Sequence, residues 1–212
     1  MMKAAIFDMD GTLLNSMQVW INFSPTFCRK YGIEWSDDIQ NAIMTMSFVE
    51  AAEYFCDNYP HIGYKKDELL DVWFKMLDDS YKTIASVKPN LVEYLEKLRS
   101  EGVPCAVATM TEHVLCDEAL KFHGLIEYFD HIITYEDVGG KGKKFPDIFY
   151  KSAELLGEAP GDCMVFEDSL HAVETAYAAG FPICGIDDNG RNDINKIAPM
   201  CKMTISDYSE LL

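Results

Sequence analysis

The stretch AAIFDMDGTLL, residues 4–14, carries the most informative pattern in this chain. Its four leading apolar residues are followed at once by Asp8, and Asp10 comes two residues later. A short continuous apolar run is typical of a strand buried on both faces, as the strands of parallel sheets are. Ligands of such sheets bind beyond the carboxyl ends of the strands, so the run places Asp8 beside a crevice. Two carboxylates next to buried residues are costly unless a cation compensates them, which favours a functional site over a plain Asp-Gly turn.

The composition is that of a globular protein of one or two domains. Of the 212 residues, 49% are apolar and 25% are charged, which suffices for a buried core. The 18 basic residues against 35 acidic ones give a net charge of −17. Because such a surface repels nucleic acid and anionic membranes, we expect neither as a partner. It also repels phosphates, so a phosphate site in this chain requires local cations.

The cysteines indicate a reducing compartment. There are seven, an odd number without a CxxC pair, and several lie in apolar runs such as VPCAVAT around Cys105. Reduced thiols of this kind are typical of cytosolic proteins. The first apolar run is too short for a signal peptide, and no run has the length of a membrane span. We therefore expect a cytoplasmic protein, and we expect it to be a monomer.

Residues 15–86, about a third of the chain, read as helices only. Ser47 with Glu50 three residues later has the form of a capping box. All three tryptophans fall in this block, which indicates the core of a small helical bundle. The expected helices cover 17–31, a shorter stretch capped by Asp37 or Asp38, 48–59 and 65–84.

From residue 87 onward, predicted helices and strands alternate. This rhythm predicts an α/β fold with a doubly wound parallel sheet. Because the helical block separates the first strand from the rest, we expect a Rossmann-like core of residues 1–14 and 87–212. An all-helical cap domain, residues 15–86, would be inserted into that core. The expected strands lie at 103–108, within 128–134, at 162–166 and at 182–186, and the helices between them at 90–101, 114–122, 146–156 and 169–179.

Short motifs stand at or near the ends of the expected strands and the starts of the helices. They are DMDGT at 8–12, AVATMT at 106–111, KGKKFPDIF at 141–149 and VFEDSLHAVETAYAAG at 165–180. In this order the four motifs resemble the signature of the haloacid dehalogenase superfamily. The helical insertion after the first motif resembles the subgroup of β-phosphoglucomutases and phosphoglycolate-type phosphatases.

The resemblance implies roles for two residues of the first motif and for one residue each of the second and third motifs. Asp8 would be the nucleophile that forms an aspartyl-phosphate, and Asp10 would be the general acid and base. Thr109, just past a strand, would bind the phosphoryl oxygens. The third motif of the family has a lysine three residues before Pro-Asp. That spacing favours Lys143, which would pair with the phosphate and Asp8, over Lys141 and Lys144.

The fourth motif supplies an acidic pair, Glu167 and Asp168. With Asp8 and Asp10 it makes up to four negative charges facing a dianionic phosphate, which Lys143 alone cannot offset. A divalent cation is therefore expected, and Mg²⁺ suits a site built from carboxylates. By resemblance the metal ligands are Asp8, the backbone carbonyl of Asp10, Asp168, and Glu167 either directly or through water.

The resemblance leaves more than one function open. We expect a Mg²⁺-dependent phosphatase of a small phosphorylated metabolite. Sugar phosphates are among the candidate substrates. The alternative is a phosphosugar mutase of the β-phosphoglucomutase type. Those mutases carry a histidine shortly after the first motif and an arginine in the cap, whereas Ser16–Trp20 holds no histidine and residues 34–64 hold no arginine or lysine. A non-catalytic protein that binds a phosphorylated metabolite is a third alternative. It is disfavoured because no motif carboxylate is missing, and Asp10 argues against a dehalogenase.

Overall fold

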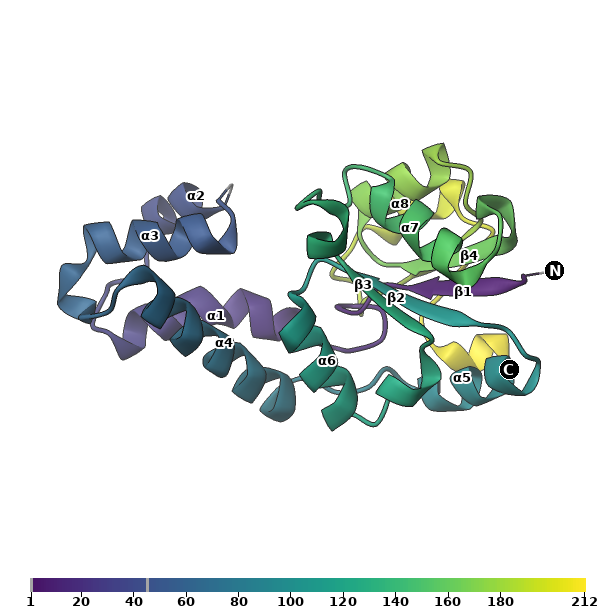
Figure 1. Cartoon of the computed structure of the whole chain (residues 1–212), viewed down its shortest axis with the longest axis horizontal. Helices are drawn as coiled ribbons and strands as arrows, with labels where there is room; N and C mark the ends of the chain where they lie inside the picture. The colour runs from purple at the N-terminus through teal and green to yellow at the C-terminus, as the bar shows by residue number, and fades with distance from the viewer. Residues whose placement is uncertain (1, 45) are drawn as a thin grey trace. The chain divides into compact units, whose positions relative to one another are not determined.

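The computed structural model describes residues 2–44 and 46–212 (Figure 1). The chain divides into two compact units. The core unit consists of the residues up to Ser16 together with Ser86–Leu212, and the helical unit consists of Met17–Ala85. No helix of the described residues is both long enough and apolar enough to cross a membrane.

Within the described residues, six parallel strands form one sheet in the core unit, in the order β3-β2-β1-β4-β5-β6. The predicted α/β fold with a doubly wound parallel sheet is thereby confirmed. The strand order reverses at β1, and the edge of the sheet at such a switch point is where ligands bind. The strands are β1 (Ala4–Phe7), β2 (Cys105–Thr109), β3 (His131–Thr134), β4 (Cys163–Glu167), β5 (Ile183–Ile186) and β6 (Met203–Ile205).

Helices cover both faces of the sheet, with α7 and α8 on one face and α5 on the other (Figure 1). Under α7 and α8, the strand residues Ile6 and Val165 share a buried core with Phe149 and Val173. The helices of the core unit are α5 (Leu91–Ser100), α6 (His113–Phe122), α7 (Asp147–Leu156), α8 (Leu170–Ala178) and α9 (Ile194–Ile197). Its short 3₁₀ turns are η2 (Ile126–Tyr128), η3 (Tyr135–Val138), η4 (Pro160–Asp162), η5 (Ala198–Met200) and η6 (Tyr208–Leu211).

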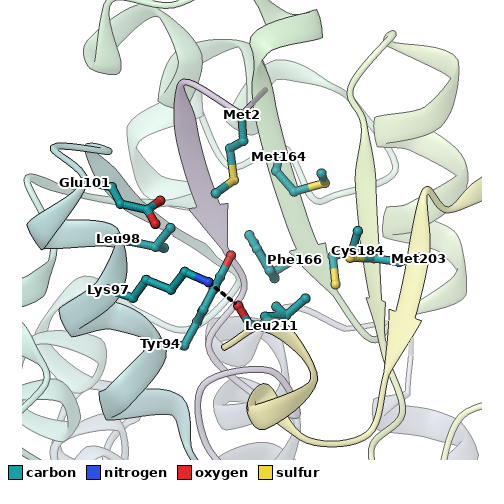
Figure 2. Close-up of a pocket in the computed structure, with 10 residues that line it drawn as sticks. All are labelled: Met2, Tyr94, Lys97, Leu98, Glu101, Met164, Phe166, Cys184, Met203 and Leu211. Carbon is teal, nitrogen blue, oxygen red and sulfur yellow. Dashed lines mark hydrogen bonds between the residues drawn. The ribbon is translucent and has the colours of Figure 1, made fainter.

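The face of the sheet that α5 covers carries a stack of aromatic rings, which includes Phe7, the residue before Asp8. The rings of Phe7 and Phe166 lie 4.3 Å apart and nearly parallel. A cavity of about 280 Å³ opens beside Phe166, between α5 and strands β4 to β6 (Figure 2). Lys97 borders it and donates a 2.8 Å hydrogen bond to the carbonyl of Leu211. No residue predicted to act in the site lines this cavity.

The two connections to the helical unit lie side by side in the core unit. Leu14 and Val87 form an isolated antiparallel bridge. The N–H of Asn15 donates to the carbonyl of Ser86 over 2.8 Å. The polypeptide therefore leaves the core unit and returns to it at the same place.

The helical unit has an aromatic core around Trp73. The rings of Phe23, Phe27 and Phe48 lie 5.0–5.4 Å from that of Trp73. The predicted capping box of Ser47 and Glu50 is present at the start of α3. The expected cap at Asp37 or Asp38 is wrong, because the hydroxyl of Ser36 accepts the N–H of Ile39 and caps α2. The helices are α1 (Met17–Lys30), α2 (Asp37–Ile43), α3 (Phe48–Asn58), η1 (Pro60–Ile62) and α4 (Lys66–Thr83).

Candidate active site

Two predicted site residues stand where neighbouring strands end. Phe7, the last residue of β1, pairs with Phe166 of β4. Asp8 and Glu167 are the next residues, and the N–H of Asp8 donates to the carbonyl of Phe166 over 3.0 Å. The sheet register therefore brings these two carboxylates together at its carboxyl edge.

Lys143 lies between these carboxylates. Its Nζ donates hydrogen bonds to Asp8 Oδ1 and, over 2.7 Å, to Glu167 Oε2. Burial alone would lower the pKa of Lys143, but the charges of Asp8 and Glu167 raise it above its ordinary value, so the ammonium stays charged. Lys141 instead pairs with Asp147 in an exposed position. The structure thus places Lys143, the lysine that the spacing favoured, beside Asp8.

Both oxygens of Glu167 are engaged by the protein. Besides Lys143 at Oε2, its Oε1 accepts the backbone N–H groups of Asp168 over 3.2 Å and Ser169 over 2.9 Å. These bonds form because β4 ends here and the chain turns into α8, which leaves N–H groups without helical partners. Glu167 is therefore suited to hold Lys143 in place.

Asp168 differs from its neighbour. The residue is 8% exposed, and among residues 2–44 and 46–212 no group donates a hydrogen bond to its carboxylate. Burial, followed by the charges of Glu167 and Asp8, raises the pKa of Asp168 to about 9. A buried carboxylate without donors is unfavourable in its ionised form, and a cation is the partner that relieves it.

The three carboxylates form a group that can hold a metal ion. One oxygen each of Asp8, Glu167 and Asp168 lies within 4.8 Å of the other two. Burial and the charge of Glu167 raise the pKa of Asp8, while Lys143 opposes that shift. All-oxygen donors of this kind fit a hard divalent cation such as Mg²⁺.

The backbone at Gly11 passes close to Asp168. A Cβ atom on Gly11 would lie 2.4 Å from Asp168 Oδ2, and the φ angle of Gly11 is +85°. Both the contact and the left-handed backbone require glycine. The loop that carries Asp10 can therefore lie against the Asp168 carboxylate.

Hydroxyl groups hold the carboxylate of Asp10. Ser16 donates to Oδ1 over 2.5 Å, and Thr111 donates to Oδ2 over 2.6 Å. Thr109, at the end of β2, is buried, and its hydroxyl accepts the N–H of Thr111 over 3.1 Å. Each oxygen of Asp10 is thus fixed by a hydroxyl.

Ser16, Thr111 and Gly11 were not predicted as site residues. Ser16 and Thr111 are six and 101 positions from Asp10, so no local spacing links either hydroxyl to it. A signal existed for Gly11, since it directly follows Asp10, but an Asp-Gly pair is equally typical of ordinary turns.

Comparison with known proteins gives a family for residues 2–180. They match the model of the haloacid dehalogenase-like hydrolases. A bifunctional riboflavin kinase/FMN phosphatase of Arabidopsis thaliana is 30% identical over 185 residues, which are 87% of this chain and 48% of that protein. The chain thus spans about half the length of that relative.

Two further comparisons cover nearly whole proteins, and both proteins are from Thermotoga maritima. A phosphorylated carbohydrates phosphatase is 28% identical over 183 residues. The match covers 84% of this chain and 82% of the phosphatase. A solved structure, provisionally named a β-phosphoglucomutase, is 26% identical with a TM-score of 0.77. That match covers 96% of this chain and 94% of the other.

Proposed function

Because the chain belongs to the haloacid dehalogenase-like hydrolases, we propose that it is a Mg²⁺-dependent phosphatase of a small phosphorylated metabolite. The observation that carries the proposal is the placement of Asp8 at the end of the central strand, with Lys143 on one of its oxygens. The buried carboxylate of Asp168 beside it supports the metal. The two similar proteins named as phosphatases support the reaction class.

In the first half of the reaction, an oxygen of Asp8 attacks the phosphorus. The bond from phosphorus to the ester oxygen breaks, and Asp10 gives a proton to the departing alkoxide. The hydroxyls of Ser16 and Thr111 keep Asp10 in one orientation, so its proton transfer needs no reorganisation. Lys143 stays charged and offsets part of the negative charge at Asp8.

In the second half, Asp10 takes a proton from water while the water oxygen attacks the phosphorus. The bond from phosphorus to Asp8 breaks and inorganic phosphate leaves. Asp8 and Asp168, with the backbone carbonyl of Asp10 and Glu167 as further ligands, would hold Mg²⁺, which supplies charge neutralisation of the transferring phosphoryl group. Thr109 would bind the phosphoryl oxygens.

A mutase is the second candidate, favoured by the name of one similar structure. The chain differs from the mutase pattern where its cap begins. Ser16 bonds to Asp10, and Trp20 donates to the hydroxyl of Tyr81 within the helical unit over 3.0 Å. With no cation in residues 34–64, a second phosphate has fewer partners in the helical unit. Water is therefore the favoured acceptor from the aspartyl-phosphate.

The reaction is tested with purified protein and a panel of phosphate esters, assayed for phosphate release with Mg²⁺ and with excess EDTA. Release that requires Mg²⁺ and is lost in Asp8→Asn supports the proposal. Equal phosphate release with Mg²⁺ and with EDTA contradicts the metal requirement. No phosphate release from any ester contradicts the phosphatase activity. For the mutase, β-glucose 1-phosphate is supplied with a trace of glucose 1,6-bisphosphate. Glucose 6-phosphate forming much faster than free phosphate would reverse the assignment.

We further propose that the protein works as a monomer in the cytoplasm, on a small metabolite and not on nucleic acid or membranes. All seven cysteines are free thiols, which supports a reducing compartment. Light scattering on the eluting protein tests the monomer, and a mass of twice 24.0 kDa would contradict it.

A further inference from the structure

The loop after β5, residues 187–192, is anchored by a buried ion pair. Lys88 Nζ donates to Asp188 Oδ1 over 2.6 Å, and the exposed fractions of the two side chains are 4% and 1%. The other oxygen of Asp188 has no hydrogen-bond partner within the described part of the chain. Asp188 Oδ2 also lies 3.9 Å from the guanidinium of Arg191, whose side chain is 39% exposed. Burying an ammonium group costs several kcal/mol, so an ion pair such as Lys88–Asp188 adds little stability over apolar side chains.

The same loop also holds the turn that carries Asp168. The side-chain amide of Asn192 donates to the carbonyl of Asp168 over 2.8 Å and to that of Ile186 over 2.7 Å. The pairing of β4 with β5 ends at Glu167 and Gly185, one residue before each of these carbonyls, so the amide joins two segments that the sheet does not pair with each other. The position of the Asp168 backbone thus depends on where this loop lies.

Lys88 itself is fixed by the chain that follows the helical unit. Its N–H donates to the carbonyl of Leu13 over 3.0 Å, next to the bridge between Leu14 and Val87. Asn189 of the loop donates to the side chain of Asn15 over 3.3 Å. The loop therefore contacts both connections through side chains, and the Asp168 turn through Asn192.

We propose that Lys88 is a positioning residue for the metal site. It holds Asp188, hence the 187–192 loop, and through Asn192 it sets the position of Asp168. The inference rests on the proposed function, because it takes Asp168 as a ligand of Mg²⁺. Partners that orient metal ligands commonly change metal affinity by about 10- to 100-fold when they are removed.

The sign of the effect separates positioning from charge. The charge of Asp188 acts on Asp168. Lys88→Met removes the buried cation that offsets Asp188, so electrostatics alone would strengthen Mg²⁺ binding. Positioning predicts the opposite, because Asp188 then keeps only the half-exposed Arg191, 3.9 Å away, moves toward water and draws Asn192 away from Asp168. We expect the Mg²⁺ dissociation constant of the substrate-free protein, measured by calorimetry, to rise about tenfold. Lys88→Arg, which keeps a cation, should largely restore binding.

Asn192→Ala provides the second arm, because it changes no charge. It should weaken Mg²⁺ binding about as much as Lys88→Met, and the double variant no more than the worse single one, since both act along one path. Lys97→Met is the matched control and should leave the constant unchanged, because Lys97 bonds to Leu211 and Leu212 away from the site.

Tighter or unchanged binding in Lys88→Met, or effects that add in the double variant, would overturn the proposal. If Lys88→Met does not fold, unchanged binding in Asn192→Ala overturns it alone. If the wild-type protein binds no Mg²⁺, the metal assignment is wrong, and the proposed role of Lys88 is wrong as well. If the variants change Mg²⁺ binding as expected but the wild-type protein releases no phosphate from any ester, only the proposed phosphatase activity is contradicted.

Discussion

The ammonium group of Lys143 lies 2.7 Å from a carboxylate oxygen of Glu167, with both side chains almost fully buried. The pair joins the loop before α7 to the end of β4, two segments that the sheet does not connect. It also occupies Glu167, whereas the neighbouring carboxylate of Asp168 receives no hydrogen bond from the residues that the structure describes. Neighbouring acidic residues in the sequence thus have different surroundings.

Lys143→Met should destabilise the fold and abolish most phosphatase activity. It leaves Asp8 and Glu167 buried without their cation, which costs about 3–5 kcal/mol. Lys141→Met removes an exposed pair with Asp147 and should cost at most about 1 kcal/mol. Urea unfolding of both variants gives the two free energies, and equal losses would contradict the buried role of Lys143.

Asp8→Asn and Asp10→Asn should differ in what accumulates. The first variant lacks the nucleophile and should form no phosphoenzyme. The second loses proton transfer, worth about 10²–10⁴-fold in rate, but keeps the attacking oxygen. With a good leaving group it should therefore form a phosphoenzyme that hydrolyses slowly. Mass spectrometry of quenched reactions distinguishes them, and a phosphorylated Asp8→Asn protein would refute the nucleophile.

The metal-free protein should lose stability as pH rises. The pKa of Asp168 is raised from its ordinary 3.8 to about 9, so at neutral pH the folded state binds a proton that the unfolded state does not. Stability therefore falls with pH between these values. Melting curves from about pH 6 to about pH 8.5 should show a declining Tm that Mg²⁺ raises most at high pH. Asp168→Asn should reduce the fall of Tm with pH. An unchanged slope of Tm against pH in this variant would contradict the assignment of the effect to Asp168.

Gly11→Ala should impair the metal site, whereas Gly102→Ala should not. Both glycines have positive φ angles, +85° and +70°, so each substitution carries a backbone strain of roughly 1 kcal/mol. Only at Gly11 does the added Cβ meet Asp168, because at Gly102 nothing lies within 4 Å. Calorimetry with Mg²⁺ should show weaker binding in Gly11→Ala alone. Equal binding in both variants would contradict the contact with Asp168.

Thr111→Val should reduce kcat about tenfold or more at saturating Mg²⁺ without preventing formation of the fold. It removes the hydroxyl that fixes Asp10 Oδ2 and keeps the volume of the side chain. Thr111→Ser retains the hydroxyl and should remain close to wild type. If both variants lose activity equally, packing and not the hydrogen bond is responsible.

The sequence predicted the parts of the site that the sheet itself assembles. Asp8 and Glu167 each follow an apolar run, and parallel strands deliver their last residues to one edge. β6 was not predicted, because the three residues Met203–Ile205 are too few to show a pattern. Contacts such as that between Lys88 and Asp188, 100 positions apart, depend on how loops pack, and no local pattern encodes them.

The bridge between Leu14 and Val87 makes the inserted helices separable in an evolutionary sense. Because the two ends of the insertion already lie next to each other, closing it demands no new loop from the core. Changes of length or sequence between those ends leave every strand register untouched. A lineage can thus graft, shorten or exchange the insertion as a cassette and inherit the catalytic sheet intact.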